Sequence, residues 1–107
     1  MYDVFLIAEA EDDIFDIYRF VAAHDSPGKA ENLFNHLRQT IDSLSELPNR
    51  GHIPPELDRV DVREFLEIHF KPYRIIYQIV ESNVYVHAVL DGRRELHDIL
   101  QRRLLNG

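Results

Sequence analysis

Residues able to hold a phosphate group and to move protons gather in the second half of this chain. Cleaving RNA through its own 2′-hydroxyl needs a base, an acid, and cations around the phosphate in the transition state. Arg74, together with Arg93 or Arg94, could supply the cations. Glu67 or His87 could transfer the protons. These five residues are the catalytic candidates if the protein is a nuclease.

Each candidate also has a structural interpretation. Arg74 could form an ion pair with Asp91 or Glu67 across a sheet, and such pairs are common without a function. His69 and His87 could be half-exposed histidines on strands. The residue types alone leave both interpretations open.

No metal or cofactor site is expected. His69 and His87 fall on strands about 9.6 Å apart, twice the usual strand spacing, which is too far for one zinc ion without a carboxylate between them. The sequence contains no P-loop, dinucleotide fingerprint or nucleophile motif. The other histidines show no ligand spacing: His24, His36, His52 and His97.

The end of the chain is basic. Four arginines stand there against Glu95 and Asp98, and apolar residues recur at helical spacing over 95–105. Such a helix either folds back on its own sheet or binds another chain, and a homo-oligomer is one option. The turn at 92–94 could also be a corner that its arginines keep soluble. We predict a contact surface for a target or partner, formed by Arg93, Arg94, Leu96, Ile99, Leu100, Arg102, Arg103 and Leu104.

The first half of the chain predicts a strand and two helices. Residues 2–8 are β-branched and aromatic, so we expect a strand buried on both faces. A helix follows to about His24, and the acids of its first turns suit the helix dipole and a solvated face. Ser26 and Pro27 predict the start of a second helix, which ends at Leu47. The two helices should form an αα-hairpin with one shared apolar face.

The second half predicts a loop and then an antiparallel meander. Residues 49–61 are rich in proline and lack any period, which indicates an exposed loop. Strands are expected over 62–70, 73–80 and 84–90.

Tight turns between these strands would place apolar side chains on one face of all three, including Ala88 and Leu90 opposite Tyr73 and its neighbours. The expected fold is α+β, of the order β-α-α-β-β-β with a C-terminal helix, and its mostly antiparallel sheet is covered on one face by the αα-hairpin. The opposite face is predicted to be polar and to carry Arg63, Phe65, Glu67, His69, Arg74, Ile76, Gln78, Val80, Tyr85, His87, Val89 and Asp91.

The composition fits one soluble domain that spans residues 1–107. The formal charge of −7 argues against general nucleic-acid binding, which depends on lysine and arginine. The chain has no cysteine, which rules out disulfides and thiol chemistry. It shows neither a secretory signal nor an apolar run long enough to cross a membrane. We therefore expect a cytoplasmic protein with no membrane partner.

Three motifs resemble those of the RelE/ParE superfamily of bacterial toxins. Residues 73–77 (YRIIY) resemble the family's YRxxY strand, and residues 89–94 (VLDGRR) resemble its V-x-HGRR or V-x-x-GKR end. Residues 47–51 (LPNRG) resemble its L-x-x-x-P-x-x-G helix end in a shifted form. The order of the predicted elements is also similar over essentially the whole length.

This resemblance implies the toxin of a type II toxin–antitoxin system, of the kind that stabilises plasmids, which blocks growth until a cognate antitoxin binds it. The RelE-like branch cleaves mRNA on the ribosome, and Arg74 matches an arginine that this branch uses. The ParE-like branch is not a nuclease and poisons DNA gyrase.

Two departures count against the nuclease branch. Its lysine-rich patch before the sheet is replaced by residues 53–58 (IPPELD), and its late aromatic residue falls at Leu100. The sequence therefore favours a ParE-like toxin that is not an enzyme, acts by protein contact and has gyrase as its expected target. A ribosome-dependent mRNA endoribonuclease and a relic that only binds its antitoxin are the alternatives.

Overall fold

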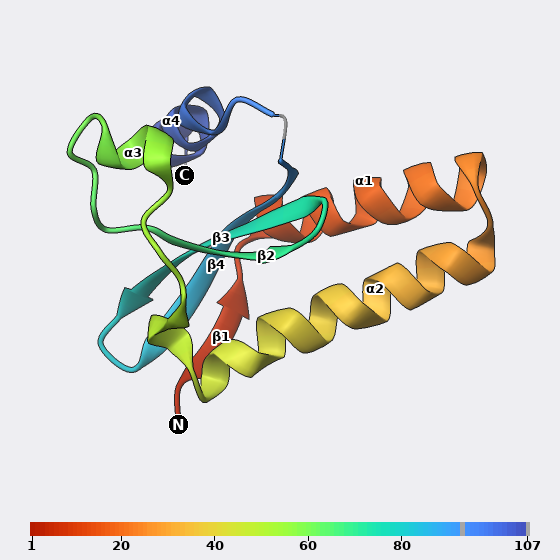
Figure 1. Ribbon diagram of the computed structural model, residues 1–107, viewed down its shortest axis with the longest axis horizontal. Coiled ribbons are helices and arrows are strands. Elements are labelled where there is room, and N and C mark those ends of the chain that lie inside the picture. The colour runs from red at the N-terminus through yellow and green to blue at the C-terminus, as the bar shows by residue number, and fades with distance from the viewer. Residues whose placement is uncertain (93, 107) are drawn as a thin grey trace.

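The computed structural model describes residues 1–92 and 94–106, and the side chains of the latter segment as far as residue 103. The helices flank one sheet (Figure 1). In chain order the elements are β1 (Asp3–Leu6), α1 (Ala8–His24), α2 (Pro27–Asp42), the 3₁₀ turns η1 (Ser43–Ser45) and η2 (Pro48–Arg50), α3 (Pro55–Asp58), β2 (Leu66–Phe70), β3 (Tyr73–Val80), β4 (Asn83–Asp91) and α4 (Leu96–Asn106).

The sheet has the strand order β1-β4-β3-β2. β1 pairs with β4 in parallel, and the other neighbours are antiparallel. Helices α1 and α2 lie along one side of the sheet, and α3 and α4 lie together on the other side (Figure 1). The α+β fold and the order of elements are as predicted, but both faces of the sheet are covered instead of one.

The prediction that the first strand is buried on both faces is wrong. β1 is an edge strand whose residues alternate between exposed and half-buried. Phe5 is 47% exposed and stacks on Tyr85 of the neighbouring strand. A short apolar run does not distinguish a central strand from an edge strand that carries a stacked aromatic ring.

The two long helices form the predicted αα-hairpin. α1 ends at His24 as expected, and the Ser26 side chain accepts a hydrogen bond from the backbone N–H of Lys29 at 3.1 Å. Pro27 occupies the first position of α2, where its missing N–H costs no hydrogen bond. α2 ends at Asp42, earlier than predicted, and η1 continues the chain.

The predicted loop at 49–61 contains two short helical segments, η2 and α3. Pro55 starts α3 at its first turn, and Leu57 is buried beneath it. The backbone N–H of Val62 then bonds to the Leu57 carbonyl at 2.9 Å. For this reason β2 begins at Leu66 and not at Val62 as predicted.

The predicted register between β2 and β3 is confirmed, whereas that between β3 and β4 is wrong. Tyr73 lies opposite Asp91, not Leu90, and the pairing shifts between Ile76 and Tyr77. Ile76 pairs with Ala88 and Tyr77 with Val86, which leaves one extra residue in β4 as a bulge. A one-residue insertion reverses the faces of all residues beyond it.

The bulge produces two apolar cores, one on each side of the sheet. Val89, predicted on the polar face, packs toward α1 and α2, whereas Ala88 and Leu90 face α3 and α4. The larger core contains Ala10, Leu37, Ile41, Leu44, Ile68, Ile75, Tyr77, Val84, Val86 and Val89. The smaller core contains Leu57, Phe65, Ile76, Ala88, Leu90, Leu96, Ile99 and Leu100.

We expect Tyr77→Phe to lower the free energy of unfolding by about 1–3 kcal/mol. The buried Tyr77 hydroxyl donates to the Pro48 carbonyl at 2.6 Å and accepts from the Gly51 N–H at 3.2 Å. Removing the hydroxyl leaves both groups without this partner. Urea unfolding would measure the loss, with Tyr85→Phe as the control because its half-buried hydroxyl accepts one long bond of 3.4 Å from Asn83. Equal costs for the two variants would contradict the prediction.

Candidate functional site

The catalytic candidates on β2 and β3, Glu67 and Arg74, lie on the face of the sheet that α3 covers. His69 pairs with Arg74 across the two strands, and Glu67 stands two residues before His69 on the same face. Glu56 reaches the same place from α3, which begins at Pro55 and is one turn long. The strands position Glu67, His69 and Arg74, and the helical turn that starts at Pro55 adds Glu56.

Arg74 is held between two carboxylates. Its Nη1 and Nη2 donate to the two oxygens of Glu56 at 2.8 and 2.7 Å. Its Nε and Nη2 donate to the two oxygens of Glu67 at 2.7 and 3.0 Å. Four of the five guanidinium N–H groups are therefore engaged. The side chain of Arg74 is 11% exposed and that of Glu67 is 1% exposed.

These contacts shift the pKa values of Arg74 and Glu56. The hydrogen bonds that Arg74 donates to Glu56 and Glu67 raise the pKa of Arg74 above its ordinary value, although burial alone would lower it. The hydrogen bond from Arg74 lowers the pKa of Glu56, against the opposing effect of burial. The arginine is thus charged at every working pH, and its charge is balanced inside the protein.

In the free protein Arg74 forms the ion pair of its structural interpretation, and its role in a nuclease site stays a prediction. A phosphate could bind the guanidinium only by displacing a carboxylate from a bidentate pair. The predicted partner Glu67 is present, and Glu56, which no sequence motif indicated, is the second. The other predicted alternative, Asp91, pairs with Tyr73 in the sheet register, whereas Arg74 pairs with Leu90.

His87 is separate from this cluster. It occupies the β4 bulge, where its Nε2 lies 3.3 Å from the side-chain oxygen of Gln78 and its ring meets Phe65 edge to face. Burial lowers the pKa of His87, so the imidazole is neutral at pH 7. In the described part of the chain, no hydrogen bond joins His87 to Arg74 or Glu67.

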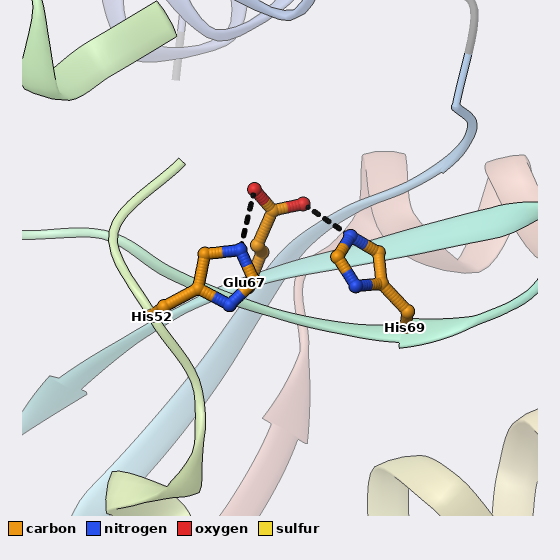
Figure 2. A group of neighbouring side chains, drawn as sticks. All are labelled: His52, Glu67 and His69. Carbon is orange, nitrogen blue, oxygen red and sulfur yellow. Dashed lines mark hydrogen bonds and ion pairs between the residues drawn. The ribbon is translucent and has the colours of Figure 1, made fainter. Parts of the chain in front are cut away.

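A second group forms beside Arg74 from residues that the sequence did not predict to lie together. His52, Glu67 and His69 converge, and Figure 2 shows the Glu67 carboxylate between the two imidazole rings. His69 Nε2 lies 2.9 Å from Glu67 Oε1, and His52 Nε2 lies 3.4 Å from Glu67 Oε2. The sequence did not indicate this group because His52 comes from the loop before the meander, and a non-local backbone bridge places it beside Glu67.

The structure describes only some of the predicted contact residues at the basic end of the chain. Arg93 lies outside the described residues, and so does the side chain of Leu104. Arg94 is exposed and lines a cleft of about 320 Å³ with Asp13, Asp16 and Phe20. Arg102 is exposed on α4.

The apolar stripe of α4 folds back on its own sheet, which was one of the two predicted options. Leu96, Ile99 and Leu100 are 0%, 5% and 3% exposed in the smaller core. In this conformation they pack in one core with Leu57 and Phe65, and their contact with a target or partner stays a prediction.

Arg103, another predicted contact residue, is tied to α1. Its Nη1 and Nη2 donate to the two oxygens of Asp13, both at 2.7 Å, and Nη1 also donates to the His87 carbonyl at 2.8 Å. Asp13 additionally accepts the backbone N–H of Val89 at 2.9 Å, and its side chain is 8% exposed. The acids of α1 are thus not all on a solvated face as predicted. The available signal was the position of Asp13 within the apolar stripe, three residues after Ala10 and four before Ile17.

A family comparison matches residues 4–96 to the family described as ParE toxin of type II toxin–antitoxin system, parDE. The chain belongs to the ParE toxin family. The match begins at the second residue of β1 and ends at the first residue of α4. No curated protein matched the chain.

Two solved toxin–antitoxin structures share the fold. The chromosomal ParDE system of P. aeruginosa superposes with a TM-score of 0.72 at 15% identity, covering 85% of this chain and 96% of that one. The RelBE2 complex of Mycobacterium tuberculosis gives a TM-score of 0.56 at 19% identity, covering 84% and 90%. The resemblance to the RelE/ParE superfamily that was drawn from the motifs is confirmed.

No helix in the described part of this ParE-family chain is long and apolar enough to span a membrane.

Proposed function

We propose that this ParE-family toxin inhibits growth by binding a protein target, that DNA gyrase is this target, and that the protein has no nuclease activity. The observation that carries the proposal is the pairing of Arg74 with two carboxylates. The charge of Arg74 is balanced by Glu56 and Glu67 through four hydrogen bonds, so the arginine expected in a ribonuclease site is occupied by the protein's own carboxylates. The net charge of −7 also opposes docking on ribosomal RNA.

The target contact is assigned to the exposed arginines around α4. Arg94 and Arg102 face solvent, and Arg93 stands beside Arg94 in the sequence. The other predicted contact residues on α4 support the exposed arginines indirectly, because they hold the helix against the sheet and α1: Leu96, Ile99, Leu100 and Arg103.

A cognate antitoxin is the proposed neutralising partner. The two structural neighbours are themselves toxin–antitoxin complexes. On this chain, α1 leaves Phe15 and Phe20 about 60% exposed, as expected of a surface that another chain covers. The cytoplasm, which contains gyrase, is the proposed location.

Growth and supercoiling assays test the gyrase claim. Expression of the chain alone should slow growth, co-expression with the antitoxin should restore it, and the purified protein should reduce DNA supercoiling by gyrase. The Arg94→Glu/Arg102→Glu variant should lose most of this inhibition. Arg19→Glu/Arg38→Glu is the matched control, because both arginines are exposed on α1 and α2. Intact supercoiling at a stoichiometric excess of toxin would reject gyrase as the target.

The second candidate function is a ribosome-dependent mRNA endoribonuclease. It is favoured by the clustering of Arg74, Glu67 and His69, which would have to exchange Glu56 for a phosphate on the ribosome. Primer extension on translated mRNA would then show cuts within codons. A relic that only binds its antitoxin would produce neither cuts nor a growth defect.

A further inference from the structure

We propose that His52, Glu67 and His69 bind one divalent transition-metal ion of the zinc class. The inference concerns a site that the proposed toxin function does not use. Two imidazoles and one carboxylate are a ligand set that zinc accepts, with a fourth position left for water.

The backbone holds the three ligands in a fixed relation. His52 and Glu67 form an antiparallel bridge in which each N–H donates to the other's carbonyl, at 3.1 and 2.7 Å. His69 follows Glu67 by two residues, so that its side chain stands on the same face of the strand. The two backbone bonds hold His52 beside Glu67 although His52 belongs to a loop, and His69 is the diagonal neighbour of His52 on the same face.

The ligand atoms are close to metal-binding distances. One ligand atom from each residue lies within 4.8 Å of the other two. His69 Nε2 is 2.9 Å from Oε1 of Glu67, and His52 Nε2 is 3.4 Å from its other oxygen, Oε2. A tetrahedral zinc ion with bonds near 2.0–2.1 Å separates its ligands by roughly 3.3 Å. Small rotations of the two imidazoles, whose side chains are 57% and 43% exposed, are enough to admit the ion from solvent.

The charge around Glu67 favours a cation. Glu56 and Glu67 together carry two negative charges against the one positive charge of Arg74, which leaves one negative charge in the cluster. The imidazoles of His52 and His69 adjoin this charge. The Arg74 fork also fixes the orientation of the carboxylate, as hydrogen bonds to metal-ligating carboxylates commonly do. Because Arg74 repels the ion, as do Arg50 and Arg59 in the adjoining clefts, the affinity should be below that of a cation-free site.

Calorimetry on the full chain tests the site directly. The protein is stripped of metal with a chelator, freed of any polyhistidine tag, and titrated with zinc chloride alone. We expect one ion per chain. His52→Ala and His69→Ala should each weaken zinc binding by about 100-fold or more. Substitution of a residue that only hydrogen-bonds to a metal ligand already costs about 10- to 100-fold in affinity, and these two variants remove a ligand itself. Magnesium chloride should not bind, because magnesium prefers oxygen ligands.

His97→Ala is the matched control, since His97 is 47% exposed and lies 4.0 Å from the carboxylate of Asp98 on α4. It should bind zinc like the wild type. Zinc should also raise the melting temperature of the wild type and of His97→Ala but not of the other two variants, because an ion that binds only the folded state stabilises it. His52→Asn and His69→Asn replace any alanine variant that does not fold. Absence of binding in the wild type, or unchanged affinity after loss of both His52 and His69, overturns the proposal.

Discussion

Replacing Arg74 by alanine should destabilise the protein by about 3–5 kcal/mol, the cost of removing one partner from a buried ion pair. Glu67 is almost fully buried and would lose the two hydrogen bonds that it accepts from the guanidinium. Glu56 would also lose both of its bonds. Urea unfolding followed by circular dichroism measures the difference. A loss of this size identifies Arg74 as a structural residue, whatever its effect on growth.

Arg63 is the matched control for this experiment. It also has two carboxylate partners, Asp58 at 3.2 Å and Asp61 at 2.9 Å, but its side chain is 61% exposed. Exposed pairs contribute about 0–1 kcal/mol, so Arg63→Ala should lie within that range. If Arg74→Ala cost no more than Arg63→Ala, the idea that the buried carboxylates depend on Arg74 would be wrong.

The pH dependence gives a second readout of the same substitution. The pKa of Glu56 is lowered in the folded state, chiefly by its hydrogen bond from Arg74. A carboxyl with a depressed pKa contributes stability that is present above its unfolded pKa and lost as the pH falls through the folded value. Stability that depends on Arg74 should therefore be full at pH 7 and decrease below about pH 4.5. The difference between the wild type and Arg74→Ala should shrink over the same range.

The three long helices and β3 could be predicted because local rules determine them. Ser26 and Pro27 mark the start of α2 through capping alone, and residues 73–80 are rich in the β-branched and aromatic residues that strands favour. The register between β2 and β3 follows from one short turn. The family resemblance rested on these same local features, which is why it could be drawn from the sequence.

The sheet faces and the site could not be predicted because they depend on non-local contacts. One extra residue near His87 reversed the faces of Ala88 and Leu90, and no residue type marks a bulge. Glu56 meets Arg74 only because Pro55 starts a one-turn helix inside a segment that has the composition of a loop. His52 meets Glu67 through backbone bonds that carry no side-chain signal.

The sequence shows an acidic start and a basic end, but it does not show that the two lie close together in the folded protein. It predicts that they belong to different surfaces. In the structure they meet, because Asp13 of α1 and Arg103 of α4 pair beside β4. A carboxylate within the apolar stripe of a helix is therefore better read as a buried partner than as a capping charge.

Replacing Asp13 by alanine should also cost about 3–5 kcal/mol of unfolding free energy. Asp13 accepts two hydrogen bonds from Arg103 and one from the backbone of Val89, and without it the Val89 N–H loses its partner. Leu96 and Ile99 still pack on the sheet, so the C-terminal half of α4 should loosen first. Hydrogen exchange should accelerate there more than at the start of the helix.

Asp16→Ala is the control, since Asp16 lies on the same helix in an exposed pair with Arg19 and should contribute less than about 1 kcal/mol. A double-mutant cycle of Asp13→Ala with Arg103→Ala should show coupling of about 0.5–3 kcal/mol, as for residues in one network. Additive losses would mean that the pair does not hold α4. If coupling is found and Asp13→Ala also weakens growth inhibition, the ion pair of Asp13 with Arg103 positions the arginines of α4 for their target. Asp13 is far less exposed than Arg102, so it would act through α4 and not by touching the target itself.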